Sequence, residues 1–584
     1  MRRAALLVFA AALLAAPFAA PPFWITLLNY IGLYSIVTLG LVLLTGVAGQ
    51  TSFGQAAFVG LGAYTTAYLS LNYPLLSPWF NLVIGMALTA LVALALGFIT
   101  LRMRGHYLPL ATIAWGISIF YVFGNLDFLG GNTGMSGIGS LSFFAWELRS
   151  ERSIYYLIWL IVLISLWMAD NLLDSRPGRA VRALKGGLEM AEAFGVDAGR
   201  LKIVVFVYAA LLASVSGWLY AHLQRFVNPT PFGINQGIEY LFMAVVGGAG
   251  SVWGAVAGAT LITLLKQLLQ SWLPPLLGRE GNYEVVVFGF LMILLLQHTR
   301  DGVWPWLARL LPGDARPRIA EAPALPGRVR PHGSAPLLLV EHARKEFGGL
   351  VAVDDLSFDI RPGEILGLIG PNGAGKSTMF NLISGALPLS RGTIRFNGQQ
   401  IGGRQPFQIA QLGIGRTFQH VKLIAGMSVL DNVALGAYLR GKTGVARAAL
   451  RLDRREEARV RAEAAAQVAR VGLADALHTP AGSLPLGQQR VVEIARALAA
   501  DPLLLLLDEP AAGLRFLEKQ QLATLLRSLR QEGMTILLVE HDMDFVMGLT
   551  DRLVVMDFGE KLAEGLPADI QRNPAVLEAY LGAV

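Results

Sequence analysis

Ten apolar runs occupy the first half of the chain and limit the folds that are open to it. Several runs approach the roughly 20 residues that a helix needs to cross a bilayer, and the shorter ones fit tilted or half-buried helices. We therefore expect an all-helical membrane domain over residues 1–311, with about ten crossings. The runs fall at residues 4–20, 23–47, 54–72, 79–101, 107–127, 153–170, 203–225, 238–252, 253–270 and 284–298.

Basic residues between the runs indicate which side of this domain faces the cytoplasm. Arg102 and Arg104 form one basic loop, and a longer loop carries Arg176, Arg179, Arg182, Lys185, Arg200 and Lys202. Both loops and the C-terminal half lie on the same side of the membrane if residues 238–270 cross it twice, with a turn at Gly247–Gly250. Because the basic residues lie in such loops, the net charge of +7 does not indicate a nucleic-acid partner.

The first 20 residues allow two interpretations. Arg2 and Arg3, the apolar run and Ala19-Ala20 also fit a cleaved signal peptide. We favour a retained first helix, because the number of crossings that places the C-terminal half in the cytoplasm then also places Arg2 and Arg3 on the cytoplasmic side.

Composition changes after the apolar runs. The whole chain is too apolar for an average soluble protein, with a mean hydropathy of +0.52 and 15% charged residues. Residues 312–336 contain six prolines, which predicts an extended, semi-rigid cytoplasmic linker with no core of its own. In residues 337–584, short apolar runs alternate with helical segments, which is typical of a largely parallel α/β sheet. The absence of cysteine excludes disulfides and thiolate metal sites.

A phosphate-binding pattern follows the apolar stretch 365–369. The spacing G-x-x-x-x-G-K-[ST] lets backbone N–H groups turn inward around the phosphates of a nucleotide. Lys376 adds a positive charge, Ser377 offers a hydroxyl for Mg²⁺, and the following helix contributes a favourable dipole. The pattern predicts an ATP site made of Gly370, Pro371, Asn372, Gly373, Ala374, Gly375, Lys376, Ser377 and Thr378.

Polar residues beside other apolar strands are candidates for the chemistry. The strand Leu503–Leu507 is followed by Asp508, suited to hold Mg²⁺ through water, and by Glu509, placed to polarise an attacking water. Gln419 is a candidate to sense Mg²⁺ or this water, and His541 to bond the γ-phosphate. Taken alone, either of these two is more typical of an ordinary surface residue.

The order of these motifs resembles that of ABC transporter ATPases. Phe347 matches the aromatic residue that stacks on adenine. The signature that contacts ATP across an ATPase dimer is matched by Leu484, Pro485, Leu486, Gly487 and Gln488, ahead of a helix expected over Val491–Ala500. Residues 416–419, 511–514, 540–543 and 578–582 are similar to the LivG-type ATPases of branched-chain amino acid importers.

The membrane half resembles the LivM-type permeases of the same importers. The resemblance rests on residues 49–64, 101–107, 130–138 and 246–258. In the two glycine-rich stretches, residues 49–64 and 247–258, small residues also predict close helix packing. Glu189, Ala191 and Gly195 match the permease loop that couples to the ATPase, and we expect a short amphipathic helix ending at Gly195. The chain therefore looks like a natural permease–ATPase fusion.

The resemblance implies an ATP-driven importer of the bacterial cytoplasmic membrane. It implies a periplasmic or lipoprotein substrate-binding protein as donor, and a LivH-like permease and a LivF-like ATPase, or a second copy of the chain, as partners. Branched-chain amino acids are the usual cargo of the family, and urea or short amides are the alternative. An ABC exporter fits less well, because about ten short runs replace the few long helices of exporters. An ATP-gated channel is the third alternative.

Two residues depart from the family pattern. Pro485 stands where the signature usually has a serine, whose hydroxyl would donate to the γ-phosphate, whereas proline has no donor. Proline is tolerated in the first turn of a helix, so the N–H groups of Gly487 and Gln488 are still expected to face phosphate. Arg515 stands where many relatives have an acidic residue. We expect an asymmetric ATPase pair, in which the ATP at Lys376 turns over and the partner's ATP, facing Pro485, turns over slowly.

Overall fold

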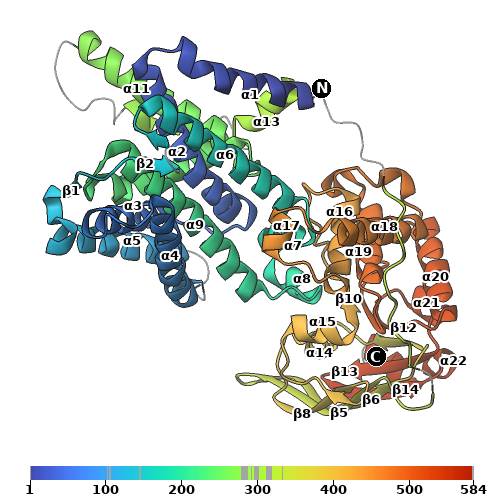
Figure 1. Ribbon diagram of the computed structural model, residues 1–584. Helices are drawn as coiled ribbons and strands as arrows, with labels where there is room; N and C mark the ends of the chain where they lie inside the picture. Colours follow the sequence, from blue (N-terminus) through green and yellow to red (C-terminus); the bar gives the residue numbers. More distant parts are fainter. Residues whose placement is uncertain are drawn as a thin grey trace. The chain divides into compact units, whose positions relative to one another are not determined.

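The computed structural model describes residues 2–101, 103, 107–143, 146–277, 287–290, 293–294, 297, 302–310, 319–331 and 333–581. These residues form two compact units (Figure 1). The helical unit comprises the described residues within 1–174, 199–316 and 449–451. The sheet unit comprises those within 175–198, 317–448 and 452–584. The segment 175–198 therefore packs with the sheet unit, although helices of the other unit flank it in sequence.

The helical unit consists of helices joined by short irregular segments and two small pairs of strands. Short antiparallel pairs join β1 (Met135–Ser136) to β4 (Phe226–Val227) and β2 (Leu141–Phe143) to β3 (Trp146–Leu148). The helices are α1 (Arg2–Ala19), α2 (Pro22–Leu41), α3 (Gln55–Asn72), α4 (Pro78–Thr100), α5 (Tyr107–Asn125), α6 (Glu151–Leu173), α9 (Ala198–Gln224), α10 (Ile234–Gly248), α11 (Gly254–Leu277) and α13 (Trp304–Leu310).

Five segments of the described chain are long and apolar enough to cross a membrane. They are Pro22–Val47, in which a π-helical segment extends α2, and α4, α5, α6 and α9. The expected two passes within 238–270 correspond to two separate helices, α10 and α11. Arg102, Arg104 and most of the run 284–298 lie outside the described residues, so the ten crossings stay a prediction.

Close backbone contacts explain the small residues of both glycine-rich stretches. A Cβ atom at Gly62 of α3 would lie 2.3 Å from the carbonyl oxygen of Ser214 in α9. A Cβ at Gly258 of α11 would lie 1.8 Å from the carbonyl oxygen of Met243 in α10. Larger side chains at these positions would push the helices apart, so the predicted close packing is confirmed.

The sheet unit contains a six-stranded sheet with the order β10-β11-β12-β7-β13-β14. Only the edge strand β14 is antiparallel to its neighbour, which confirms the expected largely parallel α/β sheet. A second sheet, with the order β6-β5-β8-β9, is antiparallel and was not anticipated. The strands are β5 (Leu338–Phe347), β6 (Leu350–Ile360), β7 (Ile365–Ile369), β8 (Arg391–Phe396), β9 (Gln399–Gln400), β10 (Ile414–Arg416), β11 (Leu504–Asp508), β12 (Thr535–Val539), β13 (Arg552–Asp557) and β14 (Glu560–Gly565).

The central strands are buried on both faces, which is why they read as continuous apolar runs. One face packs against the antiparallel sheet and α14, and the other packs against α19 and α20. The helices of this unit are α7 (Arg176–Gly186), α8 (Leu188–Ala193), α14 (Lys376–Ile383), α15 (Pro406–Leu412), α16 (Val429–Gly436), α18 (Arg454–Arg470), α19 (Leu486–Ala499), α20 (Phe516–Gln531), α21 (Met543–Met547), α22 (Pro567–Ile570) and α23 (Pro574–Leu581); α17 (Val445–Ala449) ends where the chain enters the helical unit.

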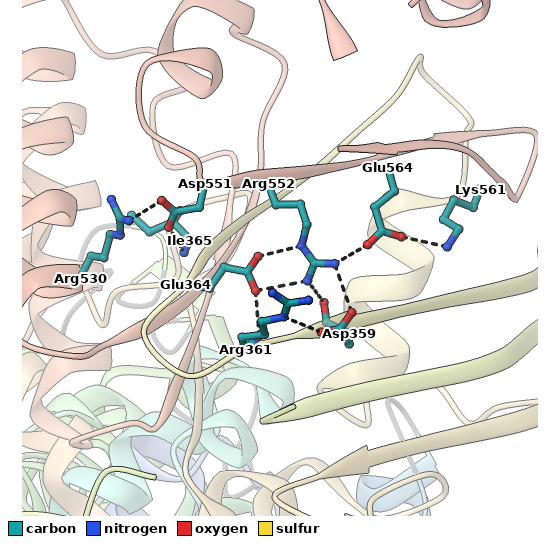
Figure 2. Close-up of polar contacts among 9 residues, drawn as sticks. All are labelled: Asp359, Arg361, Glu364, Ile365, Arg530, Asp551, Arg552, Lys561 and Glu564. Carbon is teal, nitrogen blue, oxygen red and sulfur yellow. Dashed lines mark hydrogen bonds and ion pairs between the residues drawn. The ribbon is translucent and has the colours of Figure 1, made fainter. Parts of the chain in front are cut away.

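Arg552, at the start of β13, connects the two sheets (Figure 2). Its guanidinium donates to Glu364 at 2.8 Å and to the side chain of Asp359 on β6 at 3.1 Å, and it also contacts Glu564 on β14. Burial alone would lower the pKa of Arg552, but the bonds to Glu364 and Asp359 outweigh it and raise the pKa. The cation therefore offsets three carboxylates gathered at one end of the sheets.

The described part of the linker is extended and docked on the sheet unit. Leu325 is buried against α16, α18 and α19. Arg459 of α18 donates to the carbonyl oxygen of Ala324 at 2.7 Å, and the backbone N–H of Arg328 donates to Asp501 at 2.5 Å. Residues 312–318 and 332 of the predicted linker lie outside the described residues.

Candidate functional site

The predicted phosphate loop joins the buried strand β7 to α14. Gly370, Gly373 and Gly375 all have positive φ, at 153°, 85° and 98°. A Cβ at Gly375 would also lie 2.3 Å from the carbonyl oxygen of Ala352, so the loop needs glycine there for both conformation and space. The loop ends at Lys376, the first residue of α14, so that the N-terminal end of this helix faces the loop.

The Lys376 ammonium lies inside the loop. It is buried and donates to the carbonyl oxygens of Gly370 and Pro371, each at 2.8 Å. Burial lowers the pKa of Lys376, while the charges of Glu509 and Asp508 act in the opposite direction. The lysine is thus held where the phosphates of a nucleotide would enter the loop.

Three predicted catalytic residues meet at the end of β11. Gln419 donates to the Glu509 carboxylate at 3.2 Å, and the Nε2 atom of His541 lies 2.9 Å from the same oxygen. Glu509 has a φ of +47°, an unusual value for a residue with a side chain. The arrangement places a carboxylate, an amide and an imidazole around one point, which suits the activation of a water molecule.

Arg490, in the first turns of α19, holds two of these loops together. Its guanidinium donates to the carbonyl oxygens of Glu509 and Gln419, each at 3.1 Å. Arg490 ends the signature region of the sequence, but its partners could not be predicted, because a basic residue on a helix carries no signal of its long-range contacts.

Asp508 fits the predicted role of a Mg²⁺ ligand. Its side chain is buried, and its Oδ1 atom has no hydrogen-bond partner among the residues that the structure describes. Burial raises the pKa of Asp508, although the positive charge of Arg416 opposes the shift. A buried carboxylate oxygen without a partner is a suitable ligand for a hard divalent cation, and Ser377 and Gln419 are the other predicted contributors.

The guanidinium of Arg416 lies between aromatic rings beside this site. It stands 5.0 Å from the ring centre of Phe380 and 4.8 Å from that of Phe418, and donates to the Ser384 hydroxyl at 2.5 Å. Burial lowers the pKa of Arg416 to about 10, so the cation persists at neutral pH. Arg416 is therefore a permanent positive charge near Asp508.

The signature helix begins earlier than expected. α19 spans Leu486–Ala499 rather than Val491–Ala500, and Pro485 is the residue that precedes the helix rather than a member of its first turn. The Pro485 conformation is extended, with φ −56° and ψ 150°, which proline adopts without strain. The N–H groups of Leu486, Gly487 and Gln488 consequently form the open N-terminal end of the helix.

Glu518 connects the signature to the second departure from the family pattern. Arg515 immediately precedes α20, and its backbone N–H donates to Glu518 at 2.8 Å. A Cβ at Gly487 would lie 3.0 Å from the same carboxylate, so Glu518 lies directly beside the signature. Leu484 precedes Pro485, and its carbonyl oxygen accepts from Gln489 at 2.7 Å.

Phe347 lies at the end of β5. Its ring is 43% exposed and the ammonium of Lys345 stands 4.9 Å from the ring centre. An exposed aromatic ring at a strand end is suited to stacking on a planar base, so the stacking of Phe347 on adenine stays a prediction.

The segment 175–198 is anchored by two arginines of α7. Arg179 is 1% exposed and donates twice to Glu457 of α18, at 2.5 and 2.8 Å. Arg176 donates to three carbonyl oxygens, those of Tyr438, Gly441 and Thr443, at 2.5 to 3.0 Å. Two positive charges from the predicted basic loop are thus paired with the sheet unit rather than left in solvent.

The short helix expected at Glu189–Gly195 is present as α8, two residues shorter at its C-terminal end. Ala191 is buried, and Glu189 forms an ion pair with Lys422 at 2.9 Å. Gly195 has a φ of +83°, and a Cβ there would lie 2.3 Å from Leu439. Gly195 therefore ends the helical turn in a conformation that favours glycine, as predicted.

Phe194 is a contact that sequence reasoning missed. It is buried, and its ring centre lies 4.7 Å from the guanidinium carbon of Arg496 on α19. Arg496 in turn donates to the carbonyl oxygen of Lys422 at 2.9 Å. The segment is thereby connected to the loop that carries both Lys422 and Gln419.

Comparison with known families covers most of the chain. Residues 23–296 match the branched-chain amino acid transport system permease component, residues 353–512 match the ABC transporter family, and residues 560–584 match the branched-chain amino acid ATP-binding cassette transporter family. The ATP-binding protein LivG of Escherichia coli K12 is 43% identical over 252 residues, which are 43% of this chain and 99% of LivG. The chain belongs to the ABC transporter family.

The chain is also similar to two further ATP-binding proteins and to a solved structure. LivG of Salmonella typhimurium LT2 is 43% identical and BraF of Pseudomonas aeruginosa 39% identical, each over 252 residues that make up 43% of this chain and 99% of the relative. A crystal structure of a nucleotide-free ATP-binding cassette from an ABC transporter is 31% identical, with a TM-score of 0.38, and covers 43% of this chain and 100% of its own.

The ABC transporter described here is a fusion, in which a permease domain precedes an ABC ATPase on one polypeptide. The ATPase domain binds nucleotide and hydrolyses ATP in a reaction coupled to transport. The permease is embedded in a membrane by its apolar helices, and the ATPase lies in the cytoplasm. The predicted family resemblance is therefore confirmed for both halves.

Proposed function

We propose that the chain is the fused permease–ATPase subunit of an importer that moves branched-chain, or other hydrophobic, amino acids across the bacterial cytoplasmic membrane. The observation that carries the proposal is the meeting of Glu509, Gln419 and His541 beside the phosphate loop, on a chain whose other half matches a branched-chain amino acid permease. The proposed limits are residues 1–311 for the permease, 312–336 for the linker and 337–584 for the ATPase.

In this proposal, Glu509 accepts a proton from the attacking water, and His541 donates to the γ-phosphate. The loop Gly370–Thr378 holds the phosphates of ATP, and Phe347 stacks on the adenine. Ser377, Asp508 and Gln419 would hold Mg²⁺, which supplies charge neutralisation for the phosphates when it is bound. The contacts of Glu509 with Gln419 and His541 support these assignments.

Coupling is proposed to run from the segment 175–198 to Gln419. Glu189 pairs with Lys422, which is three residues from Gln419 in the same loop. A movement of this loop changes the position of Gln419, and therefore the environment of Glu509. ATP binding at the ATPase and docking of a loaded binding protein at the permease would both change the position of this loop, as coupling between two sites requires.

Partners complete the transporter in this proposal. A periplasmic or lipoprotein binding protein delivers the solute, and a LivH-like permease and a LivF-like ATPase, or a second copy of this chain, supply the other half. Each ATP then lies between one phosphate loop and the opposite signature. Since Pro485 offers no donor, we propose that the partner's ATP turns over slowly. Glu509→Gln and the equivalent substitution in the partner should then reduce ATP hydrolysis unequally. Equal losses would refute the proposed asymmetry of the two ATP sites.

Reconstituted liposomes test the proposed function. The complex is placed in the membrane with ATP in the compartment that contains the ATPase, and labelled leucine and binding protein on the other side. We expect accumulation against a gradient, abolished by Lys376→Ala and unaffected by the surface control Lys561→Ala. Uptake that only equilibrates would indicate a channel, outward movement an exporter, and uptake of urea alone the alternative cargo. Undiminished accumulation by Lys376→Ala would refute the coupling of hydrolysis to transport.

A further inference from the structure

The helical unit contains a cavity of about 260 Å³ between α2, α9, α10 and α11. The volume is far larger than the site of a single water molecule and slightly below the range of drug-sized ligands, which suits a small solute. All the elements that form it belong to the permease half. Nothing in the ATPase chemistry uses this cavity.

A pair of opposite charges lies in the cavity wall. The Lys266 ammonium of α11 is 2.6 Å from the Glu239 carboxylate of α10, with the two side chains 41% and 21% exposed. Each is the sole charged residue of its helix. Charged residues within apolar membrane helices carry a large desolvation cost, and they commonly mark a substrate path.

The remainder of the wall combines aliphatic side chains with three tyrosines, one threonine and two glutamines. Leu27, Met243 and Ile262 are buried and give it an aliphatic surface. Thr263 also lines the cavity, and its buried hydroxyl has no hydrogen-bond partner among the described residues. The phenol of Tyr30 accepts a bond from Gln224 at 2.5 Å. The wall therefore offers an ammonium for a negative group, a carboxylate for a positive group, and aliphatic side chains beside them.

We propose that this cavity binds a zwitterionic solute with an aliphatic side chain, namely an amino acid in transit. The carboxylate of the solute takes the place of Glu239 on the Lys266 ammonium, and its ammonium pairs with the Glu239 carboxylate. The aliphatic chain contacts Leu27, Met243 and Ile262, and Thr263 offers a hydroxyl to the charged end. The inference rests on the proposed function and specifies its cargo.

The ion pair distinguishes amino acids from the neutral alternative cargo. A zwitterion replaces both charged contacts when it separates Lys266 from Glu239, so that no charge is left unpaired. Urea or a short amide would leave two partly buried charges without a full counter-charge. The same residues therefore favour a solute with both charges over one with none.

The competing explanation is that the pair only fastens α10 to α11. The double substitution Glu239→Gln/Lys266→Met separates the two, because it removes both charges and leaves none unpaired. We expect this variant to keep its thermal stability, while leucine uptake falls at least about tenfold. The matched control Glu147→Gln/Arg149→Met removes an exposed pair of the same unit and should keep full uptake. Uptake at the wild-type rate in the Glu239/Lys266 variant would overturn the proposal.

A second measurement uses the unaltered protein and needs neither ATP nor uptake. Acetylation of Lys266 by an amine-reactive reagent is followed by mass spectrometry, with Lys561 of the sheet unit as internal reference. Leucine should slow the acetylation of Lys266 at least about threefold, and its uncharged analogue 4-methylpentanamide should not. Equal effects of the two compounds, or none from either, would refute the zwitterion site. Failure of the proposed import appears separately, as absence of uptake by the wild type.

Discussion

Replacing Arg179 with methionine measures how much one buried ion pair contributes to fastening the segment 175–198 to the rest of the sheet unit. Arg179 is 1% exposed and Glu457 13% exposed, and two hydrogen bonds join them. Methionine keeps much of the apolar stem and removes the guanidinium. Among the described residues, Arg461 then remains paired with Glu457, at 2.8 Å.

The expected loss follows from these contacts. Removing one partner of a buried ion pair destabilises a protein by about 3–5 kcal/mol, because the remaining charge stays buried without compensation. Since Arg461 still neutralises Glu457 in part, we take the lower end, about 3 kcal/mol. At 1.4 kcal/mol for each factor of ten, this is roughly a 150-fold increase in the opening equilibrium of α7.

Hydrogen exchange of backbone amides measures this opening directly. In Arg179→Met, the amides of α7 should exchange roughly 150-fold faster at neutral pH, while those of α20 stay unchanged. The double variant Arg179→Met/Glu457→Met removes both charges and should recover most of the protection. A change in α7 below about threefold, or a double variant that opens as readily as the single one, would refute the reasoning.

Three further changes have definite expected results. Arg552→Met leaves Asp359, Glu364 and Glu564 without their shared cation. It should destabilise the ATPase domain by about 3 kcal/mol, which lowers the melting temperature by roughly 6–12 °C. The control Arg361→Met, at an exposed ion pair, should change the stability little. Gly195→Ala should cost about 1–2 kcal/mol locally and reduce the stimulation of ATPase by loaded binding protein, with Gly186→Ala, whose φ is not positive, as the tolerated control. Burial alone would raise the pKa of Glu457, but Arg179 and Arg461 outweigh it and hold the pKa below its ordinary value. The stabilisation from Glu457 is therefore complete at neutral pH and is lost as the pH falls through the lowered pKa, so α7 protection should fall below about pH 4 in the wild type and not in the double variant.

Local patterns were sufficient for the phosphate loop and for the buried strands, but not for the segment 175–198, which belongs to the sheet unit. Gly370, Gly373 and Gly375 adopt positive φ, which only glycine adopts readily, so their spacing is visible in the sequence. The central strands are buried on both faces, and their continuous apolar sequences predict this. The convergence of Gln419, Glu509 and His541 was expected only from motif order, since the first two are separated by 90 residues.

The start of α19 shows where local reasoning was wrong. The helix was expected from Val491, after the signature residues, which include the poor helix former Gly487. In the structure it begins at Leu486, since packing of α19 against the sheet and α16 outweighs the propensity of its first turn.

By itself, the sequence determined what each segment is: an apolar membrane half, a nucleotide-binding half, and a phosphate loop whose glycines have no substitute. Only the tertiary structure decided which charges face each other. Arg179 meets Glu457 across 278 residues, and Glu239 meets Lys266 across 27 residues on a neighbouring helix. Such pairs depend on how whole helices pack and rotate against each other, and neither can be predicted from the local sequence around one residue.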